Sequence, residues 1–106
     1  MWIVETLNAV VDAEIRALPR DLRARLVRLT DLIEALGLEQ LPRQTVKHLD
    51  GKLWELRISA ASGIARAIYV TVTGRRVIIV RAFVKKSQKT PALELRLARE
   101  RAKELE

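Results

Sequence analysis

The side chains able to do chemistry in this sequence are mostly arginines and lysines, and they are interleaved with strand-like apolar residues. Residues 43–90 hold eleven basic and two acidic side chains, a net charge of +9, although the chain as a whole carries +7. Positive charge concentrated in this way attracts polyanions. Arginine binds phosphate oxygens through a planar fork and lysine through a compact charge, and both can stabilise charge that develops on a phosphate. We therefore expect a basic surface that binds phosphate.

Arg66 and Arg81 are charges set into apolar rows. Strand alternation places Arg66 among the aliphatic residues of its own strand and gives Arg81 the same face as Ile79 and Phe83. Burying an arginine without a partner would be costly. Two alternatives stay open: either both side chains pair with Glu55 or with backbone carbonyls inside the fold, or the rows reach one end of the sheet and face a ligand in a groove.

Lys85 and Lys86 are candidates for proton transfer. If the chain cleaves RNA, the 2′-hydroxyl is the natural nucleophile, and a lysine whose pKa is lowered by neighbouring cations can act as base or acid. Lys85 adjoins Lys86 and lies close to Arg81 in the sequence. The alternative is that the two lysines are solubilising charges at a strand end. Arg57 lies opposite the apolar row of its strand, so it is either an exposed groove residue or a cross-strand partner of a carboxylate.

Other routes to phosphate chemistry lack their residues. His48 is the only histidine, which excludes a pair of catalytic histidines and a multi-histidine metal site within one chain; alone, it is either a loop residue or a catalyst. Cysteine is absent, so thiolate metal sites, cysteine nucleophiles and disulfides are excluded. Asp50 and Glu55 are the only carboxylates in the basic region, too few for a two-metal nuclease site. We expect no metal and no cofactor.

Helices are predicted before the basic region. Residues 2–5 predict a short strand, and residues 7–18 predict a helix that Pro19 ends. A second helix then runs to Gly37, with apolar side chains at helical spacing: Leu22, Leu26, Leu29, Ile33 and Leu36. Because only a proline turn separates the two helices, we expect an antiparallel helical hairpin.

Strands are predicted within the basic region. Alternation begins at Leu53, and residues 64–72 and 77–84 follow as two strands joined by a turn at residues 73–76. Residues 77–80 are apolar at every position, so this strand should be central and covered on both faces. Thr90 is the expected N-cap of a last helix, with proline at its first position.

These elements predict an α+β fold. A small antiparallel sheet, made of a short N-terminal strand and a three-stranded meander, is packed by the N-terminal helical hairpin and accompanied by a C-terminal helix. A chain of 106 residues is expected to form a single domain over residues 1–106. No apolar run approaches the length of a membrane span, so we expect a cytoplasmic protein without a membrane partner.

Three segments, in order, resemble the phage-derived Gp49-like branch of HigB toxins, within the RelE/ParE toxin superfamily. They are residues 46–58 (VKHLDGKLWELRI), residues 63–69 (GIARAIY) and residues 82–91 (AFVKKSQKTP). Together with the helical hairpin and the last helix, the similarity covers nearly the whole chain and implies a RelE-like fold.

The resemblance implies the toxin of a type II toxin–antitoxin system. Such a toxin is an RNA endonuclease that cuts mRNA in the ribosomal A site without metal. The resemblance also implies neutralisation by a HigA-like helix-turn-helix antitoxin, and contact with operator DNA only through the antitoxin complex.

The resemblance also implies roles for individual residues. By position, Arg66 is similar to the principal transition-state arginine, Lys85 or Lys86 to the basic position of the final strand, and Arg57 to the arginine of the LWELRI strand. The residues expected to bind RNA are Lys47, Lys52, Arg81, Gln88 and Lys89.

One departure from the relatives concerns aromatic residues. No tyrosine follows the final strand, so the general base is unassigned and a substrate-stacking aromatic is missing unless Trp54, Tyr69 or Phe83 substitutes. Two other functions stay open. One is a ParE-like toxin that inhibits DNA gyrase without cutting, and the other is a non-catalytic nucleic-acid-binding subunit.

Overall fold

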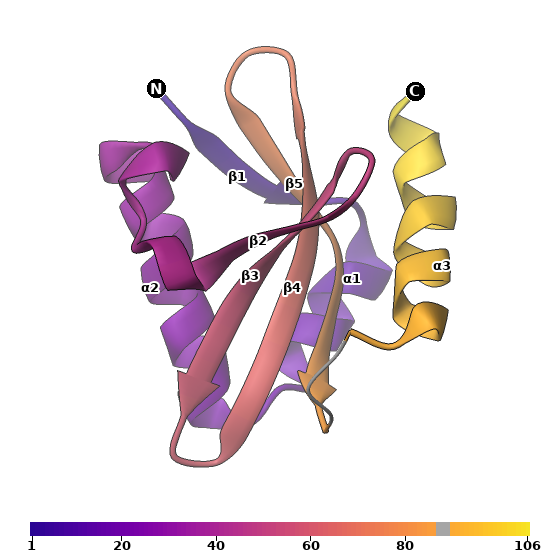
Figure 1. The fold of residues 1–106 in the computed structure, drawn as a ribbon. Coiled ribbons are helices and arrows are strands. Elements are labelled where there is room, and N and C mark those ends of the chain that lie inside the picture. Colours follow the sequence, from indigo (N-terminus) through magenta and orange to yellow (C-terminus); the bar gives the residue numbers. More distant parts are fainter. Residues whose placement is uncertain (87–89) are drawn as a thin grey trace.

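A mixed β-sheet with helices on both faces organises the chain (Figure 1). The computed structural model describes residues 1–86 and 90–106, and in this part five strands lie in the order β1-β5-β4-β3-β2. The strands are β1 (Ile3–Thr6), β2 (Val46–Asp50), β3 (Leu53–Ala60), β4 (Gly63–Val72) and β5 (Arg76–Lys85). The helices are α1 (Ala9–Arg16), α2 (Arg20–Leu36) and α3 (Ala92–Ala102), with short 3-10 turns η1 (Leu38–Gln40), η2 (Arg43–Thr45) and η3 (Lys103–Leu105).

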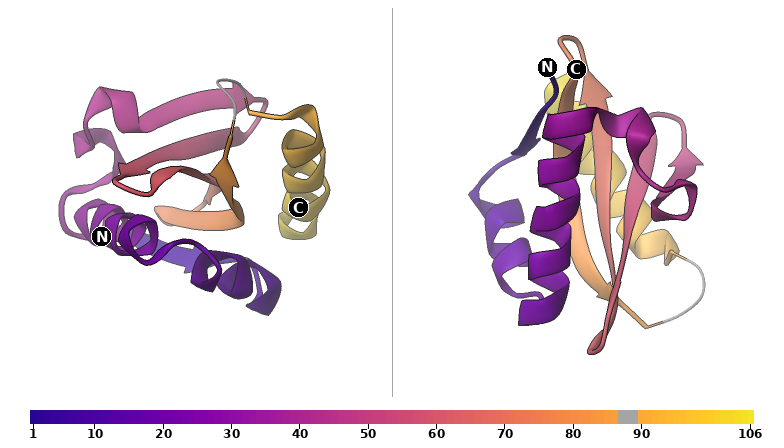
Figure 2. Two further views of the ribbon diagram at one scale, coloured as in Figure 1. Left: turned by 90° about the horizontal axis from the view of Figure 1, so that it is seen from below. Right: turned by 90° about the vertical axis from the view of Figure 1, so that its left-hand side faces the viewer.

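The predicted helical hairpin is present, and both helices lie on one face of the sheet (Figure 2). Asn8 caps α1, because its side-chain oxygen accepts a hydrogen bond from the Val11 amide at 3.1 Å. Gly37 ends α2 with a φ of 98°, a conformation that glycine adopts without the strain a side chain would bring. No helix in the described residues is both long enough and apolar enough to cross a membrane.

Hydrophobic clusters fill both sides of the sheet. On one side, α1 and α2 pack through residues such as Val11, Leu22 and Ile33 against Leu56 and Tyr69. On the other side, Ala98 of α3 packs in a smaller cluster with residues of three strands: Leu53, Ile68, Val70, Ile78, Val80 and Phe83. Residues 77–80 are all buried, as expected for a strand covered on both faces. Ile64 shares the face of Ile68 and Val70 but lies outside the cluster under α3 and is 41% exposed, so α3 covers only part of its face.

The α+β class is confirmed, with two differences in the sheet. Strand β1 pairs with β5 in parallel, from Ile3 opposite Arg76 to Thr6 opposite Ile79, so the sheet is mixed and not wholly antiparallel. Residues 46–50 form an additional strand, β2, antiparallel to β3. Asp50 pairs with Leu53, so Gly51 and Lys52 form a two-residue hairpin turn, and Gly51 has a φ of 54° that suits such a turn. His48 therefore lies in a strand, with its ring edge-on to Trp54 at 4.9 Å.

A β-bulge in β5 corrects the predicted face of Arg81. Ile68 pairs with Arg81 while Tyr69 pairs with Ile79, so Val80 is an extra residue in β5. Ile79 consequently packs under α1 and α2, whereas Phe83 packs on the α3 side, and Arg81 does not share a face with Ile79. Because of the bulge, the side chains of Phe83 and Lys85 lie on the face of the sheet that carries Arg66.

Thr90 is not the N-cap of the last helix. Pro91 occupies that position without a side-chain cap, and the Thr90 hydroxyl donates a hydrogen bond to Glu55 Oε1 at 2.8 Å. As an N-cap the hydroxyl oxygen would accept a hydrogen bond from a backbone amide. Here the hydroxyl instead donates to a carboxylate, and hydrogen bonds to ionised groups are shorter and stronger than neutral ones.

Candidate active site

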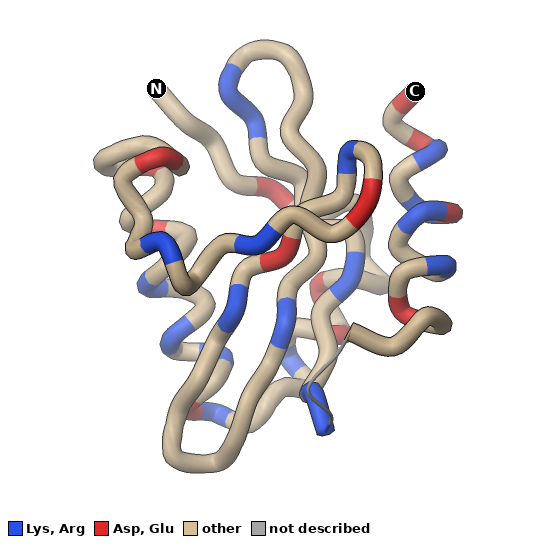
Figure 3. The backbone as a smooth tube through the Cα atoms, viewed as in Figure 1, with Lys and Arg blue, Asp and Glu red and all other residues tan. Residues whose placement is uncertain are grey.

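Charged side chains from three strands meet on the part of the sheet that α3 leaves uncovered. Figure 3 shows an acidic position on β3 with basic positions on β2, β3 and β4 around it. Arg57 lies directly opposite Arg66 in the β3–β4 pairing, and Lys85 lies on the same face, opposite Ile64. We call Glu55, Arg57, Arg66, Lys85 and Thr90 the Glu55 cluster.

Glu55 is the anion of this cluster. It is 1% exposed, and its Oε2 lies 3.4 Å from Arg66 Nε and 3.7 Å from Arg57 Nε. Its other oxygen accepts the hydrogen bond from Thr90. A carboxylate this deeply buried needs such partners, because an isolated buried charge is very costly.

Arg66 meets both alternatives that its sequence position left open. It is 6% exposed, pairs with Glu55 and donates from Nη1 to the carbonyl of Ala65 at 2.9 Å. Within the described residues, however, Arg66 Nε and Glu55 Oε2 are buried without a hydrogen-bond partner, so the two are joined by an ion pair only. Arg66 also lines a groove. Its Nε–H group, which has no hydrogen-bond partner in the described residues, is therefore close to a place where a ligand could bind.

The groove has a volume of about 610 Å³ and lies between α2, the η2 turn and the open end of β3 and β4. Its sheet wall carries Arg57 and Arg66, and its helix wall carries Arg25 and Arg28. These two helix arginines were not predicted as site residues. Their signal was a spacing of three residues, which places both on one side of α2.

Burial and mutual repulsion shift the pKa values of the cluster. Burial lowers the pKa of Arg66, with a further lowering by Arg57, while Glu55 acts in the opposite direction. Burial likewise lowers the pKa of Lys85, reinforced by Arg66, opposed by Glu55 and reinforced again by Arg57 and Lys47. Lys85 is 7% exposed, so its ammonium group has little contact with water. The sequence predicted that Lys86 and Arg81 would lower the pKa of Lys85. The lowering instead comes from burial and from Arg66, Arg57 and Lys47, which lie on β4, β3 and β2.

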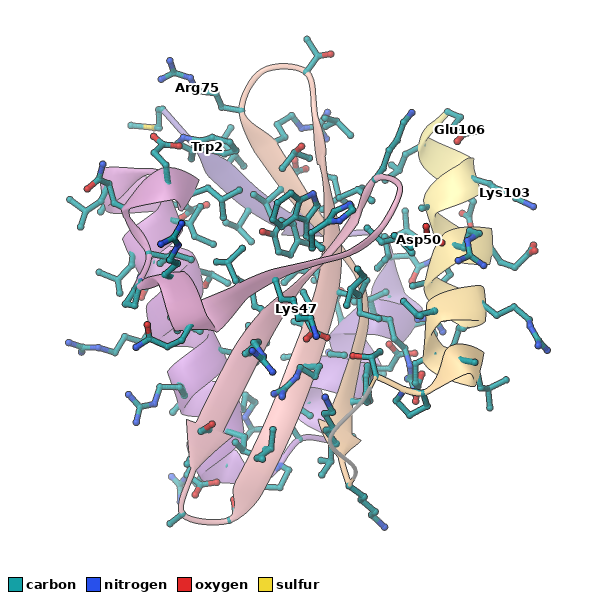
Figure 4. The ribbon with its side chains drawn as sticks, viewed as in Figure 1. Trp2, Lys47, Asp50, Arg75, Lys103 and Glu106 are labelled. Carbon is teal, nitrogen blue, oxygen red and sulfur yellow. The ribbon has the colours of Figure 1, made fainter. Side chains whose placement is uncertain are left out.

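The predicted RNA-binding residues are distributed unevenly around the cluster. Lys47 lies opposite Glu55 in the β2–β3 pairing, and its side chain extends over the sheet face (Figure 4). Lys86 is exposed immediately after β5, and Lys52 is exposed in the β2–β3 turn, beside the C-terminal end of α3. Gln88 and Lys89 lie outside the described residues.

Arg81 is engaged by carboxylates from two helices. It pairs with Glu14 of α1 at 3.0 Å and with Glu94 of α3 at 2.7 Å. The hydrogen bond that Arg81 donates to Glu94 is the main reason why the pKa of Arg81 is raised. Its guanidinium lies 5.5 Å from the centre of the Phe83 ring. Arg81 thus links α1 and α3 to β5, and its RNA contact stays a prediction.

The candidate stacking aromatics do not lie on one face. Tyr69 packs under α1 and α2, and Trp54, its cross-strand partner, shares that face. Phe83 lies opposite Arg66 and hence on the face of the Glu55 cluster, although it is 7% exposed. Among residues 1–86 and 90–106, no group of three or more His, Asp or Glu side chains is placed to hold a metal ion.

The fold and the basic face together define a RelE-like α+β protein. The structure is similar to a chain of the archaeal RelE–RelB complex from Pyrococcus horikoshii OT3, with a TM-score of 0.52 and 19% sequence identity. The similarity covers 78% of this chain and 93% of that chain, which shows the shared fold.

Residues 13–103 match the family described as Phage derived protein Gp49-like (DUF891). The chain belongs to this family of RelE/HigB-type toxins, as its three sequence segments indicated. No curated protein sequence matches it.

Proposed function

We propose that this toxin is a metal-independent RNA endonuclease that cleaves mRNA in the ribosomal A site, with the Glu55 cluster as its active site. The observation that carries the proposal is Lys85, a buried lysine of lowered pKa beside the groove arginine Arg66. Perturbed ionisable groups gathered in a groove are typical of catalytic sites. Membership of a toxin family supports the same conclusion.

In this mechanism the 2′-hydroxyl of the substrate attacks the adjacent phosphorus. The 2′-hydroxyl gives its proton to solvent water as the new 2′-O–P bond forms and the P–O5′ bond breaks, which leaves a 2′,3′-cyclic phosphate and a 5′-hydroxyl. Arg66 and Arg57 bind the phosphate oxygens and stabilise the charge that grows on them in the transition state. The Lys85 ammonium protonates the departing 5′-oxygen, because its lowered pKa makes it a stronger acid than an exposed lysine. Glu55 positions Arg66 and compensates its charge.

The decisive experiment is primer extension on mRNA after induced expression, together with cleavage assays on purified components. Wild-type toxin should cut mRNA on translating ribosomes far faster than ribosome-free RNA, and EDTA should leave the rate unchanged. Arg66→Ala should abolish growth inhibition while the protein stays folded. Equal cleavage of ribosome-free RNA would contradict the proposal. A DNA-damage response with intact mRNA would instead indicate the gyrase-inhibiting alternative, and binding without either effect would indicate a non-catalytic subunit.

We also infer a partner of opposite charge, a HigA-like helix-turn-helix antitoxin. The similar archaeal chain comes from a RelE–RelB complex, and the present chain carries a net charge of +7. Complementary charge favours such a partner. An adjacent reading frame for a helix-turn-helix protein, whose product copurifies with the toxin and suppresses growth inhibition, is the expected result. Operator DNA should be retarded by the complex and not by the toxin alone.

A further inference from the structure

The groove beside the Glu55 cluster extends well beyond the residues needed for cleavage. Strand β2 pairs with β3 only over Leu53–Leu56, so the following part of β3 is an open edge. The η2 turn and α2 border this edge and complete the groove. The groove is thus continuous from the cluster to the exposed side of α2.

The described wall of this groove is strongly basic. It includes Arg25, Arg28, Arg57 and Arg66 and no acidic side chain. Gln44, Thr45 and Ser59 add neutral polar groups, and Leu29, Leu32 and Ile64 add an apolar surface. A wall of this composition suits a flexible polyanion that also has apolar parts.

Arg25 and Arg28 differ in their partners from the arginines that form ion pairs within the described residues. Exposed arginines such as Arg20 and Arg96 also form no ion pair with the described residues, but they lie outside the groove wall, so position in the wall is what distinguishes Arg25 and Arg28. Arg57, Arg66, Arg76, Arg81, Arg99 and Arg101 all lie within ion-pair distance of a carboxylate. Arg25 and Arg28 are exposed and make no ion pair or hydrogen bond with the described residues through their side chains. Their positive charge is therefore available to a ligand.

We propose that Arg25 and Arg28 bind backbone phosphates of the RNA strand next to the cleaved phosphodiester. The inference rests on the proposed function, because Arg57 and Arg66 belong both to the cleavage site and to the groove. A strand whose scissile phosphate is held by these two residues continues along the groove to α2. The guanidinium groups at positions 25 and 28 meet its next phosphates, and the leucines of the wall contact its sugars or bases.

The first test measures binding without cleavage. A fluorescent single-stranded 2′-O-methyl RNA lacks the nucleophile, so its anisotropy reports binding alone across a range of salt concentrations. For single strands, each phosphate contact contributes about 0.7 to the slope of log affinity against log salt. We expect the double variant Arg25→Ala/Arg28→Ala to lose about 1.4 of this slope and to bind about tenfold more weakly at low salt.

A matched control removes the same charge elsewhere. Arg20 and Arg96 are exposed and lie outside the groove wall, so Arg20→Ala/Arg96→Ala should keep most of the slope. Arg25→Lys/Arg28→Lys should keep it as well, since charge is retained. Equal slopes for the groove variant and the control variant would overturn the inference. Thermal melts should show all three variants folded, because the substituted side chains are exposed.

A second measurement separates this inference from the proposed function. On programmed ribosomes, Arg25→Ala/Arg28→Ala should raise KM about tenfold and leave kcat within about twofold, whereas Arg66→Ala should abolish cleavage. If wild-type toxin cleaves but the groove variant has an unchanged KM, the inference alone fails. If the groove variant binds RNA as the control does but loses its antitoxin, the groove serves an acidic protein segment and the inference is overturned.

Discussion

At the scale of single residues, Glu55 is the group around which the site is arranged. One buried carboxylate compensates Arg66 and Arg57, opposes the lowering of the Lys85 pKa and holds Thr90 at the start of α3. These four partners come from different parts of the sequence; Arg66 and Lys85 are buried, whereas Arg57 and Thr90 are half-buried.

Glu55→Gln tests this central role. The amide keeps the shape and the hydrogen bond from Thr90 but leaves Arg66 buried without its countercharge, so we expect the free energy of unfolding to fall by about 3 kcal/mol. Urea denaturation measures the loss. Glu39→Gln, at an exposed carboxylate, is the control and should change stability little. A Glu55→Gln protein as stable as wild type would show that the ion pairs contribute nothing.

Lys85→Met tests the buried lysine in two ways. As the proton donor of the proposed mechanism, Lys85 should contribute about 100-fold to cleavage, which single-turnover assays measure. Its folded-state pKa lies below the unfolded value of 10.5, so the unfolded chain binds more protons between the two values and wild-type stability should rise with pH there. Lys85→Met should lack this rise. If Lys85→Met cleaves RNA at the wild-type rate, Lys85 is not the proton donor.

Tyr69→Phe tests a hydroxyl that is buried without a hydrogen-bond partner in the described part of the chain. Removing it should leave stability unchanged or raise it by about 1 kcal/mol. Burial raises the pKa of Tyr69 to about 12, so the folded protein keeps a proton that the unfolded chain loses above pH 10. Wild-type stability should therefore fall between pH 10 and 12. The variant should show a smaller fall in thermal melts over this range, and an equal fall would contradict the assignment.

At the scale of elements, ion pairs join the two flanking helices through the edge of β5. Glu14 of α1 forms ion pairs with Arg81 at 3.0 Å and with Arg101 of α3 at 2.7 Å. It also accepts a hydrogen bond from the Ala82 amide at 3.2 Å. Arg101 also donates to the carbonyl of Val80, the extra residue of the bulge. The bulge is thus stabilised from both faces of the sheet.

Glu14→Gln tests this connection. Burial by itself would raise the pKa of Glu14, but the hydrogen bonds from Arg101 and Ala82 and the charge of Arg81 together hold it below its ordinary value. The stability it provides is present above pH 4.5 and is lost as pH falls through the lower folded-state value. We expect about 2 kcal/mol less stability at neutral pH and faster hydrogen exchange over α3. Unchanged exchange in α3 would show that Glu14 does not hold it.

At the scale of the whole molecule, β1 closes one edge of the sheet and leaves the basic groove at the other. Its parallel pairing with residues 76–79 covers an apolar part of β5 that could otherwise pair with a second chain. The groove lies beside the open end of β3. One side of the sheet is therefore closed by β1, whereas the other borders a basic groove.

Deletion of residues 1–6 tests the closing role of β1. The exposed edge of β5 should promote association, seen as dimers or larger species in analytical ultracentrifugation, together with a lower thermal midpoint. Deletion of residue 1 alone is the control, since it leaves every β1 pair intact. A shortened protein that stays monomeric with an unchanged midpoint would contradict the prediction.

The sequence by itself determined most of the elements and many of their buried faces, although it did not predict β2 or the face of Arg81. The leucine spacing of α2, the alternation of β3 and the apolar run of residues 77–80 are local patterns, and periodicity reports which side of an element is buried. Strand alternation also placed Arg66 correctly on the same face of β4 as Ile64, Ile68 and Val70. The parallel partner of β1 and the extra residue in β5 were not predictable in this way, because strand pairing joins residues distant in the chain.

Only the tertiary structure decided which charges meet. Continued alternation from Ile79 would have turned Lys85 toward α1 and α2, but the bulge at Val80 turns it toward Arg66. No role for Arg25 and Arg28 was predicted from the sequence, and the packing of α2 beside the open edge of β3 is what places them in the groove wall. A side chain's type and period are local properties, whereas its neighbours follow from register and packing between elements, and for this reason the chemistry of the groove emerged only from the fold.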